Sequence, residues 1–230
     1  MRLNKFLAKT GLASRRKCDE FISDGLIKIN EKIVTDFSFK VGRDDIVKFK
    51  NKILEFENEN ILYLLNKPRN YICTSNDPYD RKKIIDLIPS RYRLFSIGRL
   101  DYKTTGLILL TNNGDLANNF IHPKNKIIRK YEVHSNKQIK RENIKAIKKG
   151  IVINNTKYKA DISIITKIKN PESYLWSVTL KQGKNREIRK IFEFLNQEIY
   201  SLHRYEFAGI KLGSLKPGKF KKIKISELLK

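Results

Sequence analysis

The first fifty residues carry apolar positions at helical spacing, interrupted by basic residues. A helix is expected near the start and should end at Gly11, because a glycine after the last apolar turn commonly stops a helix. Its apolar face is formed by Leu3, Phe6, Leu7 and Thr10. A second helix is expected over 14–23, with Ser14 as its N-cap. Its inward positions are Cys18, Phe21 and Ile22.

Short alternating segments follow these helices and predict a small sheet. The expected strands are 26–29, 32–34 and 45–50, with a turn at Asn30-Glu31 between the first two. Beyond them, EFENEN at 55–60 is polar, acidic and without periodicity, which is typical of a linker. We therefore predict one small domain over 1–55 and a second over 61–230.

The longer part of the chain alternates strands with a few helices. Strands are expected at 61–65, 71–74, 94–97, 107–110, 130–134, 151–153, 159–166 and 175–180, with short strands around 202–204 and Gly209. The segment 71–74 is expected to pair antiparallel with 61–65. Helices are expected at 115–120, at 139–149 and after the glycine-containing loop that opens GKNREIRKIFEFLN. The inner face of this last helix is formed by Ile188, Ile191, Phe192 and Leu195.

One acidic residue stands out in the basic, threonine-rich stretch GRLDYKTTGLILLTNNG, which runs from Gly98 to Gly114. Asp101 is expected on a tight connection between the strands at 94–97 and 107–110. An aspartate is ionised at neutral pH, so it can serve as a nucleophile or a base. The alternative is that Asp101 only caps the loop by bonding to the hydroxyls of Thr104 and Thr105.

Composition points to nucleic acid as the partner. Lys and Arg number 49 against 24 Asp and Glu, so the formal charge is +25, and ten Tyr and twelve Phe provide flat surfaces for stacking. The alternative is a solvated basic surface without a specific partner.

Several classes of protein are not indicated. No stretch of 18 apolar residues exists and the start lacks a signal-peptide apolar region, so a cytoplasmic protein without membrane contact is expected. The cysteines and histidines lack the spacing of a disulfide framework or a zinc site. They are expected to be structural or surface residues: Cys18, Cys73, His122, His134 and His203.

The segment LNKFLAKTGLASRRKCDEFISDGLIKIN resembles the alpha-L motif, a small RNA-binding domain first recognised in the fourth protein of the small ribosomal subunit. The resemblance covers residues 1–50. That family places the basic start of its second helix against the RNA backbone. The phosphate contacts implied here are Lys5, Arg15, Arg16 and Lys17. Where the family usually has an asparagine-glycine turn, this chain has Asn30-Glu31.

Four separated segments together resemble a second family. They are GRLD at 98–101, KYEV at 130–133, NREIR at 185–189 and LHR at 202–204. In this order they are similar to the bacterial ribosomal RNA pseudouridine synthases that begin with an alpha-L domain. The resemblance implies an α+β fold, in which a mixed, mainly antiparallel sheet with flanking helices follows the small domain.

The resemblance also implies roles. Asp101 would be the catalytic aspartate, Tyr131 the ring against the target base, Arg189 the partner of the aspartate, and Leu202 the apolar residue beneath the site. Arg99 and Arg186 would contact RNA. Taken alone, Tyr131 is an ordinary strand tyrosine, Arg189 a solvated helix charge and Leu202 a core residue.

The implied reaction breaks the bond between base and sugar and rejoins the same base through carbon, so no cofactor, metal or second substrate is expected. The target must first leave its stack, and an aromatic ring can offset that cost. The segment at 64–90 and the two-arginine form NREIR resemble the synthases of large-subunit rRNA more than those of small-subunit rRNA, which implies large-subunit rRNA, free or in an assembling particle, as the substrate. A monomer is expected.

Three alternatives stay open at this point. The same reaction on small-subunit rRNA is one. A noncatalytic ribosome-assembly protein is another, because charge and the first domain account for RNA affinity without any reaction. An RNA methyltransferase would need a glycine-rich loop after a strand, and the sequence has none.

Overall fold

The structure is a computed structural model that describes residues 1–74, 77–169 and 172–228. The chain forms two compact units. The first comprises Met1–Ile61 together with Ser90–Leu94 and Asn112–Gly114, and the second comprises the rest. Within the first unit, Asn112 holds the predicted linker: its Nδ2 donates to the Glu59 carbonyl at 2.8 Å, and its Oδ1 accepts from the Ile61 N–H at 2.8 Å.

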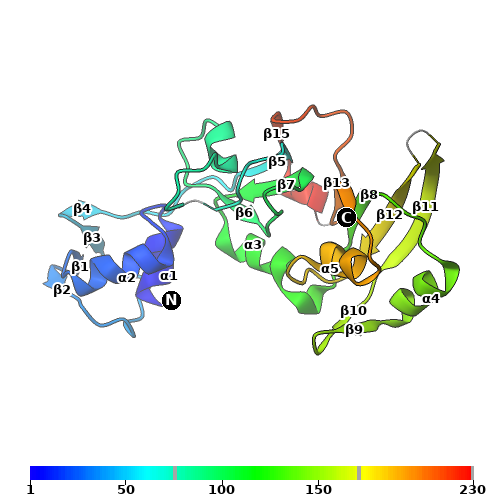
Figure 1. The fold of residues 1–230 in the computed structure, drawn as a ribbon. Helices are drawn as coiled ribbons and strands as arrows, with labels where there is room; N and C mark the ends of the chain where they lie inside the picture. Colours follow the sequence, from blue (N-terminus) through cyan, green and yellow to red (C-terminus); the bar gives the residue numbers. More distant parts are fainter. Residues whose placement is uncertain (75–76, 170–171, 229–230) are drawn as a thin grey trace. The chain divides into compact units, whose positions relative to one another are not determined.

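The first unit packs two helices on a four-stranded sheet (Figure 1). Its elements are α1 (Leu3–Lys9), α2 (Arg15–Ser23), β1 (Ile27–Ile29), β2 (Lys32–Ile33), β3 (Val47–Phe49) and β4 (Lys52–Ile53). The strands pair antiparallel in the order β2-β1-β3-β4. Ser14 caps α2 by accepting from the Lys17 N–H at 3.1 Å, as predicted. Only β4 had no counterpart among the predicted strands.

The turn between β1 and β2 adopts left-handed backbone angles although it contains no glycine. Asn30 and Glu31 both adopt positive φ, 48° and 66°. The Asn30 side chain stabilises this turn, because its Oδ1 accepts from the Ile46 N–H at 3.0 Å and its Nδ2 donates to Asp45 at 2.8 Å. Asparagine tolerates the left-handed region better than most residues, and here it is also held from the side.

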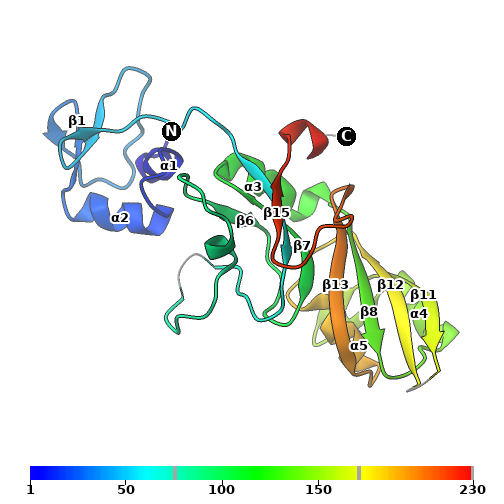
Figure 2. The same cartoon turned by 90° about the horizontal axis from the view of Figure 1, so that it is seen from above.

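The second unit is built on a nine-stranded sheet with helices beside it (Figures 1 and 2). Its strands are β5 (Leu62–Lys67), β6 (Phe95–Ile97), β7 (Thr105–Thr111), β8 (Arg129–Ser135), β11 (Asp161–Ile168), β12 (Ser173–Leu180), β13 (Ile199–Phe207), β14 (Ile210–Lys211) and β15 (Phe220–Lys222). β9 (Ile151–Ile153) and β10 (Thr156–Tyr158) form a separate hairpin. The helices are α3 (Gly114–Ile121), α4 (Arg141–Lys149) and α5 (Glu187–Phe194), with 3₁₀ turns η1 (Ile84–Leu87), η2 (Pro123–Asn125) and η3 (Ile225–Leu228).

The strand order is β11-β12-β8-β13-β7-β5-β15, with β6 beside β7 and β14 beside β13. Every pair is antiparallel except β13 with β7, which meet in parallel through His203↔Thr105 and Arg204↔Gly106. At this seam a Cβ on Gly106 would lie 2.2 Å from the Arg204 carbonyl oxygen. Only glycine therefore allows the two halves of the sheet to join. The mixed, mainly antiparallel sheet of an α+β fold is confirmed.

Two predictions about strands were wrong. The segment 71–74 is not the partner of β5; Ile72 makes only an isolated parallel bridge to Lys83, while β5 pairs with β7 and with β15. The strand predicted around 202–204 is not short but nine residues long, whereas the short strand predicted near Gly209 is confirmed as β14. Register shifts on either side of 201–204 interrupt the alternation that would have indicated a single strand.

Smaller differences concern element ends. The helix predicted over 139–149 begins at Arg141, and the helix predicted over 115–120 begins at Gly114, so that Asp115 lies in its first turn. β10 had no counterpart among the predicted strands.

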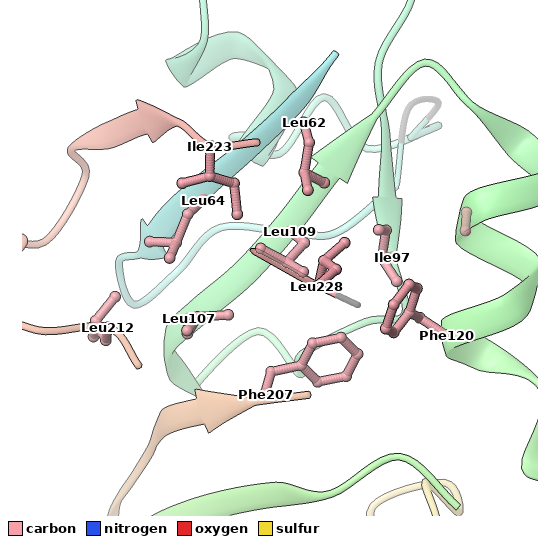
Figure 3. Packing of buried hydrophobic residues seen from close by; sticks show 11 residues of the cluster. Leu62, Leu64, Ile97, Leu107, Leu109, Phe120, Phe207, Leu212, Ile223 and Leu228 are labelled. Atoms are coloured by element: carbon pink, nitrogen blue, oxygen red, sulfur yellow. The ribbon is translucent and has the colours of Figure 1, made fainter. Parts of the chain in front are cut away.

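The core of the second unit lies where β5, β6 and β7 meet α3 and the C-terminal segment. Figure 3 shows Leu64, Leu109, Ile97 and Phe120 pointing toward one another, with Phe207 beside them. None of the helices that the structure describes is long and apolar enough to cross a membrane.

Candidate active site

Asp101 lies in the loop between β6 and β7, two antiparallel strands paired from Phe95↔Thr111 to Ile97↔Leu109. The loop closes on itself, because the Thr104 N–H donates to the Asp101 carbonyl at 3.0 Å. The predicted tight connection between strands is confirmed. It places the carboxylate at the end of a buried hairpin.

The Asp101 carboxylate faces two arginines from the start of α5. Its Oδ2 lies 3.4 Å from Arg189 Nε and 4.0 Å from Arg186 Nη1. The Asp101 side chain is 35% exposed and that of Arg189 only 17%. Burial lowers the pKa of Arg189, and the negative charge of Asp101 opposes that shift. The ion pair predicted between Asp101 and Arg189 is confirmed.

The threonine hydroxyls have other partners. Thr104 Oγ1 accepts from Arg189 Nη2 at 3.2 Å, and Thr105 Oγ1 lies 2.9 Å from His203 Nδ1. Arg189 therefore bridges the carboxylate and the buried hydroxyl of the same loop. This arrangement is an arginine-held carboxylate, not a loop cap by threonines.

Tyr131 and Leu202 form the apolar part of the site from adjacent strands, β8 and β13, and each is buried. They line one cavity of about 140 Å³ together with Asp101 and Arg189. A cavity near 150 Å³ binds one benzene-sized ring, so the space fits a single planar base. Its other predicted members are Arg99 and Arg186, both exposed at the rim.

The predicted phosphate contacts of the first unit form a separate group. Arg15, Arg16 and Lys17 are exposed in the first turn of α2, and Lys5 is half-buried on α1. Lys17 forms an ion pair with Glu20 at 2.5 Å. Both side chains are more than half exposed, so the two remaining donors of the Lys17 ammonium stay accessible to a phosphate.

The cysteines and histidines are spread over the chain. Cys18 is in the core of the first unit, and Cys73 Sγ accepts from the Leu100 N–H at 3.4 Å. No group of three or more His, Cys, Asp or Glu side chains suited to a metal ion occurs within 1–74, 77–169 and 172–228.

Arg186 adopts a positive φ of 50° at the N-cap of α5. Such a conformation is uncommon for arginine and usually persists only where the surroundings impose it. Next to it, buried Glu187 accepts from Gln182 Nε2 at 2.6 Å and from the Lys184 N–H at 3.1 Å. Glu187 thus fixes the loop that carries Arg186 over the cavity.

Sequence reasoning missed Lys67, which is fully buried at the end of β5. Its Nζ donates to the carbonyls of Thr104 at 2.8 Å, Pro68 at 3.0 Å and Tyr102 at 3.3 Å. Burial lowers its pKa to about 8, so the ammonium is mostly protonated at neutral pH. The sequence signal for this role was a lysine at the end of an apolar strand. Lys67 holds the backbone of the Asp101 loop through these carbonyls.

We expect Lys67→Met to reduce the single-turnover rate by roughly tenfold or more, because the loop loses its anchor and about 1.4 kcal/mol of misplacement is a tenfold effect. RNA affinity should stay unchanged. The folded pKa of about 8 is below the ordinary lysine value, so the folded protein binds fewer protons than the unfolded chain above pH 8. The free energy of unfolding of the wild type should therefore rise relative to Lys67→Met between about pH 8 and 10.

Lys221→Met is the matched control, since it removes the same charge from an exposed position on β15. It should show neither the loss of rate nor the pH-dependent difference. Equal rates for Lys67→Met and Lys221→Met would contradict the anchoring role.

Two arginines beside the cavity were also missed, buried Arg204 and half-buried Arg129. Arg204 is on the same face of β13 as Leu202, two residues on, and Arg129 begins β8; both line the cavity. The alternation of Leu202 and Arg204 was the sequence signal that Arg204 points inward.

Comparison with known proteins agrees with this geometry. Residues 61–194 match the family model described as RNA pseudouridylate synthase, and residues 1–47 match that of the S4 domain. An uncharacterized RNA pseudouridine synthase of Borreliella burgdorferi is 39% identical, over 99% of this chain and 91% of the relative. The ribosomal large subunit pseudouridine synthase B of Bacillus subtilis is 35% identical, over 94% of this chain and 89% of the relative.

A third relative, the dual-specificity RNA pseudouridine synthase RluF of Escherichia coli, is 33% identical over the whole of this chain and 77% of its own length. Among solved structures, a pseudouridylate synthase with 26% identity superposes with a TM-score of 0.72. That likeness covers the whole of this chain and 98% of the other.

Proposed function

Because the chain belongs to the RNA pseudouridylate synthase family and is an RNA isomerase, we propose that it converts one uridine of large-subunit ribosomal RNA to pseudouridine, with Asp101 as the reacting carboxylate. The observation that carries this proposal is the ring-sized cavity, in which Asp101, Tyr131, Arg189 and Leu202 meet from four separate segments. A noncatalytic RNA-binding protein has no need of such a cavity.

The steps follow from the residues around the cavity. The target uridine leaves its stack at a cost of a few kcal/mol, which contact with the Tyr131 ring and the apolar side chain of Leu202 offsets. Asp101 lies at the opening, held by Arg189 and by the loop that Lys67 supports. The bond between sugar C1′ and uracil N1 breaks, the base turns, and C1′ bonds to C5. Substrate and product contain the same atoms, so no oxidant and no second substrate is consumed.

The RNA strand is expected to approach over a second hollow of about 520 Å³ that shares Asp101, Arg99 and Arg186 with the cavity. Its charged lining residues, apart from Asp101, are all cations: Arg99, Lys184 and Arg186. Positive groups at the rim bind phosphates and position the strand, while the cavity selects the base.

The large subunit is preferred because the Bacillus subtilis relative is named as an enzyme of that subunit. Pseudouridine should be mapped in rRNA from cells with and without this protein. One uridine of the large-subunit rRNA should lose its modification in the deletion strain and regain it with the wild-type gene. Loss in small-subunit rRNA would overturn the choice of substrate, and an unchanged map of both would overturn the rRNA proposal.

RNA binding should depend steeply on salt. The formal charge is +25, and each phosphate neutralised contributes a slope of roughly −0.7 to −0.9 in log affinity against log salt concentration. Titrations of an rRNA stem-loop between about 50 and 200 mM salt measure that slope, because binding through phosphate contacts weakens steeply over this range. A nearly flat response would show that the cations do not contact phosphates.

A further inference from the structure

Arg204 is a buried cation with an incomplete set of partners. The residue is 2% exposed, and its Nε donates to the Leu107 carbonyl at 2.8 Å. Its Nη2 is buried and has no hydrogen-bond partner among the described residues. Buried polar atoms are almost always bonded, so an unpaired donor beside a cavity calls for an explanation.

A second guanidinium is close to it. The Arg204 and Arg129 guanidinium carbons lie 4.7 and 5.4 Å from the centroid of the Phe207 ring, and both arginines line the cavity. Arg129 Nη1 donates to the Ile127 carbonyl at 2.6 Å. Burial lowers the pKa of Arg129, and the positive charge of Arg204 adds to that effect.

Neither arginine forms an ion pair with a carboxylate in the part of the chain that the structure describes. Tyr131 and Glu187 act in the opposite direction and partly offset the lowering of the Arg129 pKa. Arg204 is removed from water and Arg129 is half-buried, so each guanidinium carries a desolvation cost that no ion pair offsets. The cost falls once a negative charge occupies the cavity.

The reaction produces such a charge. When the C1′–N1 bond breaks, its electron pair leaves with uracil and spreads over N1, O2 and O4. Later the pair at C5 forms the new bond to C1′, the C5 proton leaves to solvent, and N1 takes up a proton. Between these events the detached base is an anion, whichever atom Asp101 attacks first.

We propose that Arg204, assisted by Arg129, stabilises the detached uracil as an anion, an inference that rests on the proposed function. The position of the pair suits the task, because Tyr131 and Leu202 define where the base lies and both arginines line that same space. Charges that are already oriented in a water-poor site stabilise a developing charge without having to reorganise.

Two other roles would also use Arg204. It could tie β13 to β7 through Leu107, which is a purely structural role at the seam of the sheet. It could instead bind a phosphate of the target nucleotide. The experiment must separate stabilisation of the leaving base from both.

The full-length protein is assayed in single turnover on two rRNA stem-loops, one with uridine and one with 5-fluorouridine at the target. Fluorine withdraws electrons and makes the uracil anion intrinsically more stable, so less help is needed. Arg204→Met should slow breakage of the C1′–N1 bond in the uridine RNA by roughly 10²- to 10³-fold, the usual cost of one such donor. With 5-fluorouridine the loss should shrink to about tenfold or less. Arg204→Lys, which keeps the charge, should lie between.

Thr105→Val is the matched control, because it removes the Thr105–His203 contact at the same seam without touching the cavity. A structural role predicts equal losses on both substrates for both variants, and that result would overturn the proposal. A phosphate role predicts weaker binding and a salt slope reduced by about one, with no difference between substrates, which would overturn it too. If Arg204→Met does not fold, the same comparison with half-buried Arg129→Met decides, with a smaller loss that again shrinks on the fluorinated RNA. Wild-type protein that leaves uridine unchanged would instead refute the proposed function.

Discussion

Replacing Asp101 with asparagine is expected to abolish turnover while RNA affinity stays unchanged. The amide keeps the shape of the side chain but removes the negative charge that faces Arg189 at 3.4 Å and that we propose reacts with the flipped nucleotide. Affinity should survive, because we expect phosphate contacts to supply most of it and the substitution leaves the basic residues proposed to make them unchanged. Single-turnover conversion and binding constants on one rRNA stem-loop measure the two effects separately.

Asp161→Asn is the matched control for this substitution. Asp161 is a half-exposed carboxylate on β11, 3.6 Å from Lys148, and it lines neither hollow of the site. Its removal changes the net charge equally and should leave turnover intact. Wild-type chemistry in Asp101→Asn would refute the proposed role of the carboxylate.

Replacing Arg189 with alanine is expected to slow the reaction by on the order of 10²-fold, about 2–3 kcal/mol. Arg189 both faces the carboxylate and donates to Thr104, so its loss frees the Asp101 loop on one side. A larger loss is not expected, since Asp101 is 35% exposed and water screens part of the interaction. Arg189→Lys keeps the charge but not the planar fork, so it should show an intermediate defect.

Arg186→Ala tests whether Asp101 is supported by the geometry of Arg189 or only by positive charge near the carboxylate. Arg186 Nη1 is 4.0 Å from the same carboxylate oxygen, but its side chain is 53% exposed. Its loss should weaken RNA binding more than it slows the chemical step. Equal effects of Arg186→Ala and Arg189→Ala on the single-turnover rate would show that net positive charge, not the geometry of Arg189, supports Asp101.

Local sequence patterns were sufficient to predict many features of this protein. Ser14 as an N-cap, the Asp101 hairpin and the inward face of α5 each depend on residues a few positions apart. The pairing of Asp101 with Arg189 was also predicted, but from the resemblance of four segments to a family rather than from any local spacing.

The burial of Lys67 and Arg204 could not be deduced in the same way. A charged residue can be kept out of water only where distant carbonyls come within reach, as those of Tyr102, Thr104 and Leu107 do here. The sequence shows that a lysine ends a strand or that an arginine follows a buried leucine. It does not show that the chain supplies their partners from 35 or 97 positions away.

By itself, the sequence determined the period and the inward faces of most elements and the Ser14 cap of α2, because these depend on side chains that are neighbours along the chain. Only the tertiary structure decided that β15 and not 71–74 flanks β5, and that β13 runs parallel to β7. Strand order is set by pairing between residues far apart along the chain, such as Phe220 with Leu65 and His203 with Thr105, and the space at Gly106 lets β13 and β7 meet. The cavity lies where Asp101 on one side of that seam faces Tyr131 and Leu202 on the other.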